Sequence, residues 1–395
     1  MIALGSLPLV GEGLRGELIS MKAKKIENGA GLAIVYYHVV LLLTLPFYFY
    51  FTPPGLGMVI TTIILYFFTG ISITAGYHRF YSHKTYKMHP IAEGVLLYLA
   101  TMAAQGSVLR WAFEHRLHHA HVDTDNDPYS IKKGFWYAHV LWLMEKPRPI
   151  DPKFIKDLTK NKWLVFQDKH YVSLLLLTNI PVWILAGYFF HDFIGAFVFA
   201  IWVRVLVLHH TTWFINSLAH TFGAQTFSKE HSAVDNFVIS FLTFGEGYHS
   251  YHHTFAMDYR NGIRWYHFDP TKWLIWGLHK CRLASDLRTM DNYTIQKRMV
   301  LEDRNLLLNR IKDLMYVRKE ILEQKVQEIS DKIATQISEF QTLLREYKTR
   351  KMLKQHADLQ ILKAQIKSMK KAIHQEWRSW LKLSRQIMHL KPLAA

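Results

Sequence analysis

Histidines in this sequence recur in clusters whose spacings bring several imidazoles together. The stretch from Phe244 to Thr254 reads F-G-E-G-Y-H-S-Y-H-H-T, with histidines at offsets i, i+3 and i+4. On a helix, these offsets place the side chains on one face. E-H-R-L-H-H repeats the offsets, and H-R-F-Y-S-H and N-S-L-A-H add further members. The candidate ligands are His78, His83, His115, His118, His119, Asn216, His220, His249, His252 and His253.

These clusters predict metal binding. Imidazole is the commonest side-chain metal ligand and suits iron, copper, zinc and nickel. Nine clustered histidines exceed the coordination sphere of a single ion, so the pattern favours two metals. Only one cysteine is present, Cys281, which excludes an intramolecular disulfide and any cysteine-based zinc or iron–sulfur site.

Four long apolar runs must position the clusters. Half of the 395 residues are hydrophobic and the net charge is +17. Residues 31–51, 56–76 and 171–190 contain no Lys, Arg, Asp or Glu, and residues 193–214 are interrupted only by Arg204, His209 and His210. Each run is long enough to cross a bilayer. The sequence therefore predicts an all-α integral membrane protein with four transmembrane helices.

The distribution of charge predicts the topology. The link at residues 52–55 and the one around His191 contain no Lys or Arg, whereas the remaining segments hold nearly all of them. The positive-inside rule then places both termini and the long middle loop in the cytosol. All four histidine elements fall on that side, as a histidine-rich helical cap. Residues 91–108, shorter and less apolar, are expected to form an interfacial or protein-covered helix that leads to His115.

We expect three parts in the chain: a cytosolic segment at 1–30, a membrane domain at 31–290 and a basic helical extension at 291–395. Residues 291–391 contain no Gly or Pro, and apolar residues recur there at coiled-coil spacing. One straight helix of about 150 Å and a hairpin turning near 354–358 are both compatible. The extension is strongly basic beyond Lys348, where Trp377, Trp380 and Leu381 also lie. Three interpretations of this basic part remain open: it binds an anionic membrane surface, it binds an acidic partner, or it is simply a solvated helix. Nucleic acid is not an expected partner.

The histidine motifs resemble the boxes of membrane fatty-acid desaturases, in the delta-9, stearoyl-CoA-type branch that acts on acyl-CoA or acyl-lipid. The resemblance covers roughly residues 31–283. It implies two iron ions at the cytosolic membrane face, held directly by the nine histidines and through a water by Asn216. It also implies an oxygen-dependent reaction that introduces a cis delta-9 double bond into a long saturated acyl chain. Removing hydrogens from unactivated methylenes needs an oxidant that no side chain provides.

The same resemblance implies an acyl tunnel. Gln105, Trp111 and Thr212 match residues around the kink of the acyl chain, and Tyr66 matches the residue that closes the far end. Gly70 shares a helix face with Tyr66, and Trp213 adjoins Thr212. Replacing Tyr66 with alanine is therefore expected to shift the preference toward longer chains. By sequence neighbourhood, the acceptors expected to orient the ligands are Glu114, Asp127 and Glu246.

The headgroup site departs from the acyl-CoA enzymes of the family. Gly106, Ser107 and Phe113 stand where polar or basic groups would help to bind CoA. Basic residues of the middle loop offer compensation, so acyl-CoA and acyl-lipid both remain open, with acyl-CoA favoured; these residues are Lys132, Lys133, Lys146 and Arg148.

Electrons are expected from a separate ferredoxin, rubredoxin or cytochrome b-type donor, because no haem or dinucleotide motif is present. Such donors are usually acidic and would suit the basic face. The alternatives are a fatty-acyl hydroxylase with the same two irons and a histidine-rich metal transporter or sensor. His209 and His210 lie within the fourth apolar run together with Arg204. They are expected to line the tunnel or to stabilise the helix that leads to the predicted ligand His220.

Overall fold

The computed structural model describes residues 29–314, 318–353, 355 and 358–390, and their regular secondary structure is almost entirely helical. Their only paired strands are β1 (Lys87–Met88) and β2 (Ala284–Ser285), which are antiparallel. The chain divides into two compact units, one at 29–225 with 231–289 and the other at 226–230 with 290–390. The predicted segment at 1–30 lies almost wholly outside the described residues, and the three-part division stays a prediction.

The first unit contains four helices long and apolar enough to cross a membrane. The first is α2 (Gly29–Phe51), and α3 (Leu56–Ser72) continues into η1 (Ile73–Ser82). The third is α9 (Tyr171–Phe190), and the fourth runs through α10 (Phe193–Gly195), η5 (Ala196–Val203), α11 (Arg204–Ser217) and η6 (Leu218–His220). Large apolar side chains such as Leu42, Tyr50 and Phe189 are exposed on these helices, as lipid-facing residues would be. The predicted all-α membrane protein with four transmembrane helices is confirmed.

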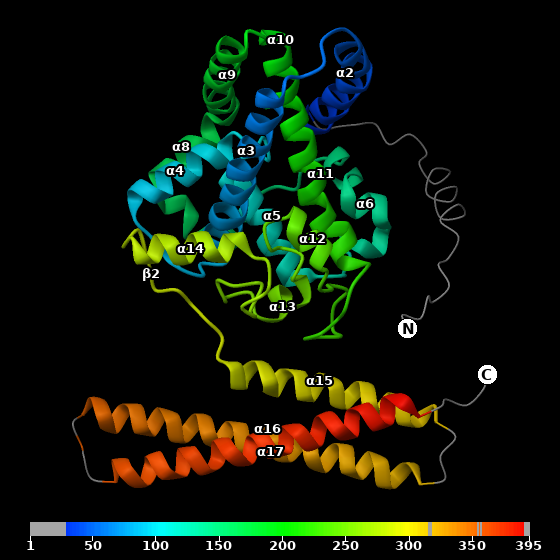
Figure 1. Ribbon diagram of the computed structural model, residues 1–395, viewed down its shortest axis with the longest axis vertical. Coiled ribbons are helices and arrows are strands. Elements are labelled where there is room, and N and C mark those ends of the chain that lie inside the picture. The colour runs from blue at the N-terminus through cyan, green and yellow to red at the C-terminus, as the bar shows by residue number, and fades with distance from the viewer. Residues whose placement is uncertain (1–28, 315–317, 354, 356–357, 391–395) are drawn as a thin grey trace. The chain divides into compact units, whose positions relative to one another are not determined.

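Shorter helices gather at one end of these four (Figure 1). Here lie α5 (Val108–His121), α12 (Phe237–Leu242) and α13 (His249–Thr254). The remaining elements of the unit are α4 (Pro90–Thr101), η2 (Ile131–Lys133), α6 (Phe135–His139), η3 (Leu141–Met144), α7 (Pro152–Ile155), η4 (Leu158–Lys160), α8 (Lys162–Lys169) and α14 (Pro270–Lys280).

The single helix expected at 91–108 is wrong. Helix α4 ends at Thr101, and a loop follows before α5 begins. In this loop Ala104 and Gly106 have φ values of +58° and +86°, which a right-handed helix does not allow. Ser107 then caps α5, since its hydroxyl accepts a hydrogen bond from the Arg110 amide.

The segment η1 is a π-helix, in which backbone hydrogen bonds join residues five apart. The His83 amide donates to the His78 carbonyl at 3.2 Å. A step of five residues is slightly more than one full turn of a π-helix, whereas in an α-helix residues five apart would point about 140° apart. The two imidazoles therefore lie on one face, with their ring centroids 4.9 Å apart.

The second unit contains α15 (Asn292–Lys312), α16 (Lys319–Met352) and α17 (Leu359–His389). Of the two predicted arrangements, the structure has the hairpin, because the chain turns between Met352 and Leu359. The three helices share one apolar core that includes Val300, Ile337 and Trp380. Trp380 is fully buried and Trp377 packs against the core, so neither indole is presented as a membrane anchor.

Candidate metal centre and acyl cavity

The nine box histidines form two groups, each with nitrogen atoms converging within 4.8 Å of one another. One group contains five residues and the other four. The five-membered group consists of His78, His83, His115, His119 and His252, and the four-membered group of His118, His220, His249 and His253.

The spacing of these nitrogens fits metal coordination. In the first group, His252 Nε2 lies 3.0 Å from the Nε2 atoms of both His78 and His119. In the second, His249 Nε2 lies 3.1 Å from His220 Nε2 and 3.0 Å from His253 Nε2. Imidazole nitrogens bound at about 2.1 Å to one ion lie about 3.0 Å apart when they are at right angles. The residues of each group therefore fit one metal ion.

Each i, i+3, i+4 triplet is divided between the two groups. His115 and His119 of α5 belong to the first group, whereas His118 belongs to the second. In α13, His252 belongs to the first group and the two flanking histidines to the second. Each helix therefore contributes to both groups, which ties the two sites together at the meeting point of η1, α5, η6 and α13.

Burial favours the neutral imidazoles that bind metals. Desolvation, reinforced by neighbouring histidines, lowers the pKa of the box histidines outside the spanning helices for which a shift is resolved; these are His83, His115, His119, His249, His252 and His253. A neutral ring keeps a lone pair for a metal.

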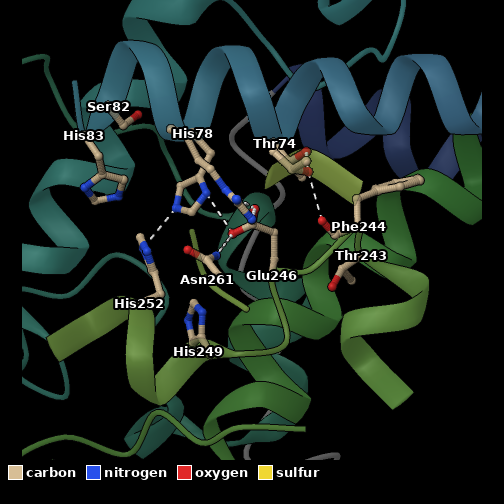
Figure 2. Close-up of polar contacts among 12 residues, drawn as sticks. Thr74, His78, Ser82, His83, Thr243, Phe244, Glu246, His249, His252 and Asn261 are labelled. Carbon is tan, nitrogen blue, oxygen red and sulfur yellow. Dashed lines mark hydrogen bonds and ion pairs between the residues drawn. The ribbon is translucent and has the colours of Figure 1, made fainter. Parts of the chain in front are cut away.

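Two of the three carboxylates expected to orient ligands contact them. A Glu246 oxygen lies 2.8 Å from His78 Nδ1, and an Asp127 oxygen lies 2.9 Å from His118 Nδ1. Figure 2 shows His252 and Glu246 on different sides of the His78 ring, so that each ring nitrogen faces a different partner. Such contacts select the tautomer that presents Nε2 to a metal.

Glu114 differs from this expectation. It pairs with Arg110, whose Nη1 lies 3.8 Å away, and its side chain lines the cavity described below. Burial raises the pKa of Glu114 to about 7. Because α5 directs His115 inward, its chain neighbour points along the cavity wall instead.

A buried network that sequence reasoning missed supports Glu246. The Arg79 guanidinium donates to one Glu246 oxygen at 2.9 Å and pairs with Asp269 at 3.0 Å. The Asn261 amide donates to the other Glu246 oxygen at 2.7 Å (Figure 2). Burial alone would raise the pKa of Glu246, but the interactions with His78 and Arg79 hold it below its usual range. The carboxylate beside His78 is therefore kept ionised and fixed in place.

A second unpredicted chain of contacts reaches His220. Its Nδ1 lies 2.7 Å from the Ser232 hydroxyl, and that hydroxyl donates to Asp123 at 2.7 Å. Asp123 also accepts from the Ser232 amide. Asp123 could have been suspected from its loop beside the second box, but Ser232 carries no such signal.

A cavity of about 930 Å³ adjoins the metal centre. Its volume lies within the range of about 300–1,000 Å³ that small-molecule sites occupy. Apolar residues of α2, α9, η5 and α11 form much of the wall, and His78, His118 and His249 lie in its lining. Its shape and chemistry suit a long apolar chain beside the two groups of histidines.

Five of the six predicted substrate contacts line this cavity: Gly70, Gln105, Trp111, Thr212 and Trp213. The Gln105 amide donates to the Thr212 hydroxyl at 2.8 Å, and its oxygen accepts from the Trp111 indole at 3.4 Å. The Trp111 ring stacks on His115, with centroids 5.0 Å apart. This trio links the cavity wall to a predicted ligand.

Tyr66 does not line the cavity. Its hydroxyl donates to the Leu242 carbonyl at 2.5 Å, and its ring packs on Phe244, which is part of the lining. A Cβ atom on Gly70 would lie 2.1 Å from the Phe244 ring, so the glycine makes room for this side chain.

The part of the cavity wall formed by α9 extends to Trp183, whose ring packs on Phe197 with centroids 5.4 Å apart.

The remaining candidates lie near the centre without joining either group. Asn216 lines the cavity, and its role through a water stays a prediction. His209 also lines it, and its Nε2 lies 3.1 Å from the Ala104 carbonyl oxygen. His210 lies between His38 and His139, 3.0 Å from each. Its two nitrogens face different neighbours, so these three rings do not converge on one ion.

Two partly exposed ion pairs to Asp157 join the metal-binding elements. Arg116 of α5 donates to the Ser82 carbonyl at 3.0 Å, and it pairs with Asp157 at 2.7 Å. Lys84 pairs with the same carboxylate at 2.9 Å. Burial opposes ionisation of Asp157, but Arg116 and Lys84 outweigh it and hold its pKa below the ordinary 3.8. The pairs join the end of η1 to α5.

The Asp157→Asn variant is expected to lose a pH-dependent part of this stability. Because the folded-state pKa is depressed, the ion pairs stabilise the protein above about pH 4, and this contribution disappears as the pH falls through the folded pKa. For a side chain that is one-third exposed, we expect about 1 kcal/mol. Thermal melting should show a gap between wild type and variant at neutral pH that closes in acid. A gap independent of pH would contradict the ion-pair origin.

Comparison with known proteins decides the family. A family model described as fatty acid desaturase matches residues 26–282. The chain belongs to the fatty acid desaturase family. It is 38% identical over 258 residues to acyl-CoA desaturase 1 of Saccharomyces cerevisiae, which covers 64% of this chain and 50% of that protein. It is 39% identical over 277 residues to a probable acyl-CoA desaturase of Schizosaccharomyces pombe, covering 68% of this chain and 58% of the other.

A bacterial desaturase is similar over much of its own length. The sn-1 stearoyl-lipid 9-desaturase of Anabaena variabilis is 32% identical over 232 residues, which is 58% of this chain and 83% of that protein. In contrast, the chain spans only about half to three-fifths of the length of the two yeast relatives. The predicted membership of the desaturase family is confirmed, and the family model covers the part of the chain that carries the histidine groups.

Proposed function

We propose that this desaturase introduces a cis delta-9 double bond into long-chain saturated acyl-CoA. The observation that carries the proposal is the position of two converging histidine groups beside an apolar cavity. The names of the relatives support it, since they describe acyl-CoA desaturases and a stearoyl-lipid 9-desaturase. Acyl-lipid is the second candidate substrate.

Two iron ions are the proposed cofactors, one for each histidine group. When bound, iron supplies the oxidising chemistry with dioxygen that removal of hydrogen from unactivated methylenes requires. The protein's own contribution is to hold the ligands in place and to exclude water. Glu246 and Asp127 fix the imidazoles of His78 and His118, and the apolar wall keeps water from the acyl chain.

The trio of Gln105, Trp111 and Thr212 is proposed to set the position of the double bond. These polar groups satisfy one another across the cavity, so they form a fixed step in an otherwise apolar wall. A chain that bends around this step would present one pair of carbons to the histidine groups. Regioselectivity then follows from the distance between that step and the cavity mouth.

The active site and both termini are proposed to be cytosolic, as the positive-inside rule predicts. Electrons would come from a separate acidic donor of the ferredoxin, rubredoxin or cytochrome b type. Arg110 lies in the cavity lining and donates to the Arg148 carbonyl, so the Arg148 backbone adjoins this cation. This charge favours the phosphates of CoA, with Lys146 as a further candidate.

The proposal is tested by expression in a host that cannot make unsaturated fatty acids. Growth and a delta-9 alkene, located by mass spectrometry of the lipids, are expected. A hydroxyl group at the same carbons would assign the alternative hydroxylase. Saturated lipids alone, with iron-loaded protein present, would overturn both. A metal transporter or sensor would instead change cellular metal content without any change in the lipids.

The far end of the cavity supplies a prediction on chain length. Phe197 packs on Trp183 and on Trp202, with ring centroids 5.4 and 4.8 Å apart, and all three side chains line the cavity. We expect Phe197→Ala to shift products toward longer chains, and to do so more than Tyr66→Ala, because Tyr66 lies behind Phe244. Product profiles from mixed saturated substrates measure this. A larger shift for Tyr66→Ala would restore that residue as the tunnel floor.

A further inference from the structure

Helix α17 carries a cationic stripe made of Lys363, Lys367, Lys370, Lys371, Arg378, Lys382 and Arg385. Apart from the adjacent Lys370 and Lys371, these residues recur three, four or seven positions apart, and all seven lie within about 120° of the helix circumference. All seven side chains are exposed, and so are His374 and His389, which continue the same spacing. The stripe is about 33 Å long.

Folding does not account for the stripe. The core-facing residues of α17 include Ile373, Trp380 and Ile387, and they lie on the side of the helix away from the cations. Among the described residues, none of the seven cations pairs with a carboxylate. The one acidic residue of α17 is Glu376, which pairs with Lys332 at 2.6 Å. Like charges three or four apart weaken a helix, so the stripe opposes the stability of its own helix.

Neighbouring α16 shows that this imbalance is specific to α17. Helix α16 contains seven Lys or Arg and six Asp or Glu residues, whereas α17 contains seven and one. A helix that needs only solubility can mix both signs, as α16 does. The concentration of one sign on one exposed face therefore indicates an anionic partner.

The topology of the chain indicates which anion lies within reach. The last spanning helix ends at His220, and none of the described helices beyond it is long and apolar enough to cross a membrane. The described chain beyond His220 therefore stays on the side of the bilayer on which that helix ends. Anionic lipids of the cytosolic leaflet attract basic segments held close to them, and tethering by four spans keeps the effective concentration high.

We propose that the cationic stripe of α17 binds the anionic headgroups of the bilayer that the first unit spans. The contact is electrostatic, because the two tryptophans of α17 are turned into the bundle core. Leu381 and Met388 are exposed beside the stripe and add a small apolar contact at headgroup depth. This role is independent of the chemistry proposed for the histidine groups.

The test uses the full-length chain in nanodiscs of phosphatidylcholine alone or mixed with phosphatidylserine. Lysine acetylation followed by mass spectrometry reports the accessibility of Lys363, Lys370 and Lys382, with exposed Lys325 and Lys348 of α16 as internal references. We expect several-fold slower labelling of the stripe lysines in anionic discs. High salt should remove the difference, because it screens charges beyond a few ångströms.

Two matched triple variants separate the stripe from net charge. The first is Lys367→Gln with Lys371→Gln and Arg378→Gln, and the control is Lys325→Gln with Arg345→Gln and Lys348→Gln. All six residues are exposed, so both variants leave the bundle core intact and change the net charge equally. Each charge removed from the stripe should weaken the lipid contact roughly five-fold. The first variant should therefore lose the protection, and the control should keep it.

Other results would overturn the proposal. Equal labelling of the stripe lysines in neutral and anionic discs would contradict the proposed lipid contact. Equal loss of protection in both triple variants would also contradict it. Protection in neutral discs caused by an acidic soluble protein would assign the stripe to protein docking. Protection by inorganic phosphate alone would indicate a discrete anion site instead of a surface contact.

Discussion

Replacing His252 with alanine is expected to abolish product formation and to remove one of the two proposed irons. His252 Nε2 lies 3.0 Å from the Nε2 atoms of both His78 and His119, so this ring occupies the middle of the five-membered group. Changes at residues that only orient a ligand already cost about 10–100-fold, so we expect a loss of more than about 100-fold here. Iron content of the purified protein and product yield measure the effect.

The matched control is His170→Ala, which removes an exposed histidine at the junction of α8 and α9. This variant should retain both irons and full activity. The four-membered group contains no atom of His252, so the iron remaining in His252→Ala should be held there. Unchanged iron and product in His252→Ala would exclude this residue from the ligand set and would place the metal elsewhere.

The Glu246→Gln variant has the second-largest expected effect. The carboxylate faces His78 Nδ1 at 2.8 Å and pairs with fully buried Arg79 at 2.9 Å. An amide oxygen accepts from His78 Nδ1–H more weakly than a carboxylate does, and an amide does not neutralise the guanidinium. We expect metal affinity and activity to fall by about 10–100-fold. Unfolding of the metal-free protein should become easier by about 3 kcal/mol, the low end for a broken buried pair, because Asp269 still faces Arg79.

Two measurements separate these effects of Glu246. Competition with an iron chelator reports the affinity of the site, and thermal melting of the metal-free protein reports the network around Arg79. Glu328→Gln removes an exposed carboxylate of α16 and should change neither. A loss of melting temperature with normal iron affinity would make Glu246 a structural residue and would contradict its assigned role beside His78.

Local pattern predicted much of the centre. All nine histidines of the boxes fall in the two groups, because each lies next to an apolar segment that delivers it to one end of the membrane helices. Asp127 and Glu246 could be named as neighbours of ligands for the same reason. Glu114 could not be resolved this way, since adjacency to His115 does not show which way a side chain turns.

Contacts between residues that are distant in the sequence could not be predicted from local sequence patterns. Arg79 meets Asp269 across 190 positions, and His220 meets Ser232 through a loop with no regular spacing. Local pattern also did not show that Phe244, which comes from a separate segment, lies between Tyr66 and the cavity. Such contacts depend on how helices pack, which periodicity along one helix does not encode.

From the amino-acid sequence alone, the four spans, the histidine boxes and the family could be read, because hydropathy and ligand spacing are properties of short stretches. Only the tertiary structure divided each triplet between two groups and wound residues 73–82 as a π-helix. It also turned the tryptophans of α17 inward and left its cations outside. The physical reason is that ligand grouping and helix facing are set by neighbouring helices, and those neighbours are distant in the chain.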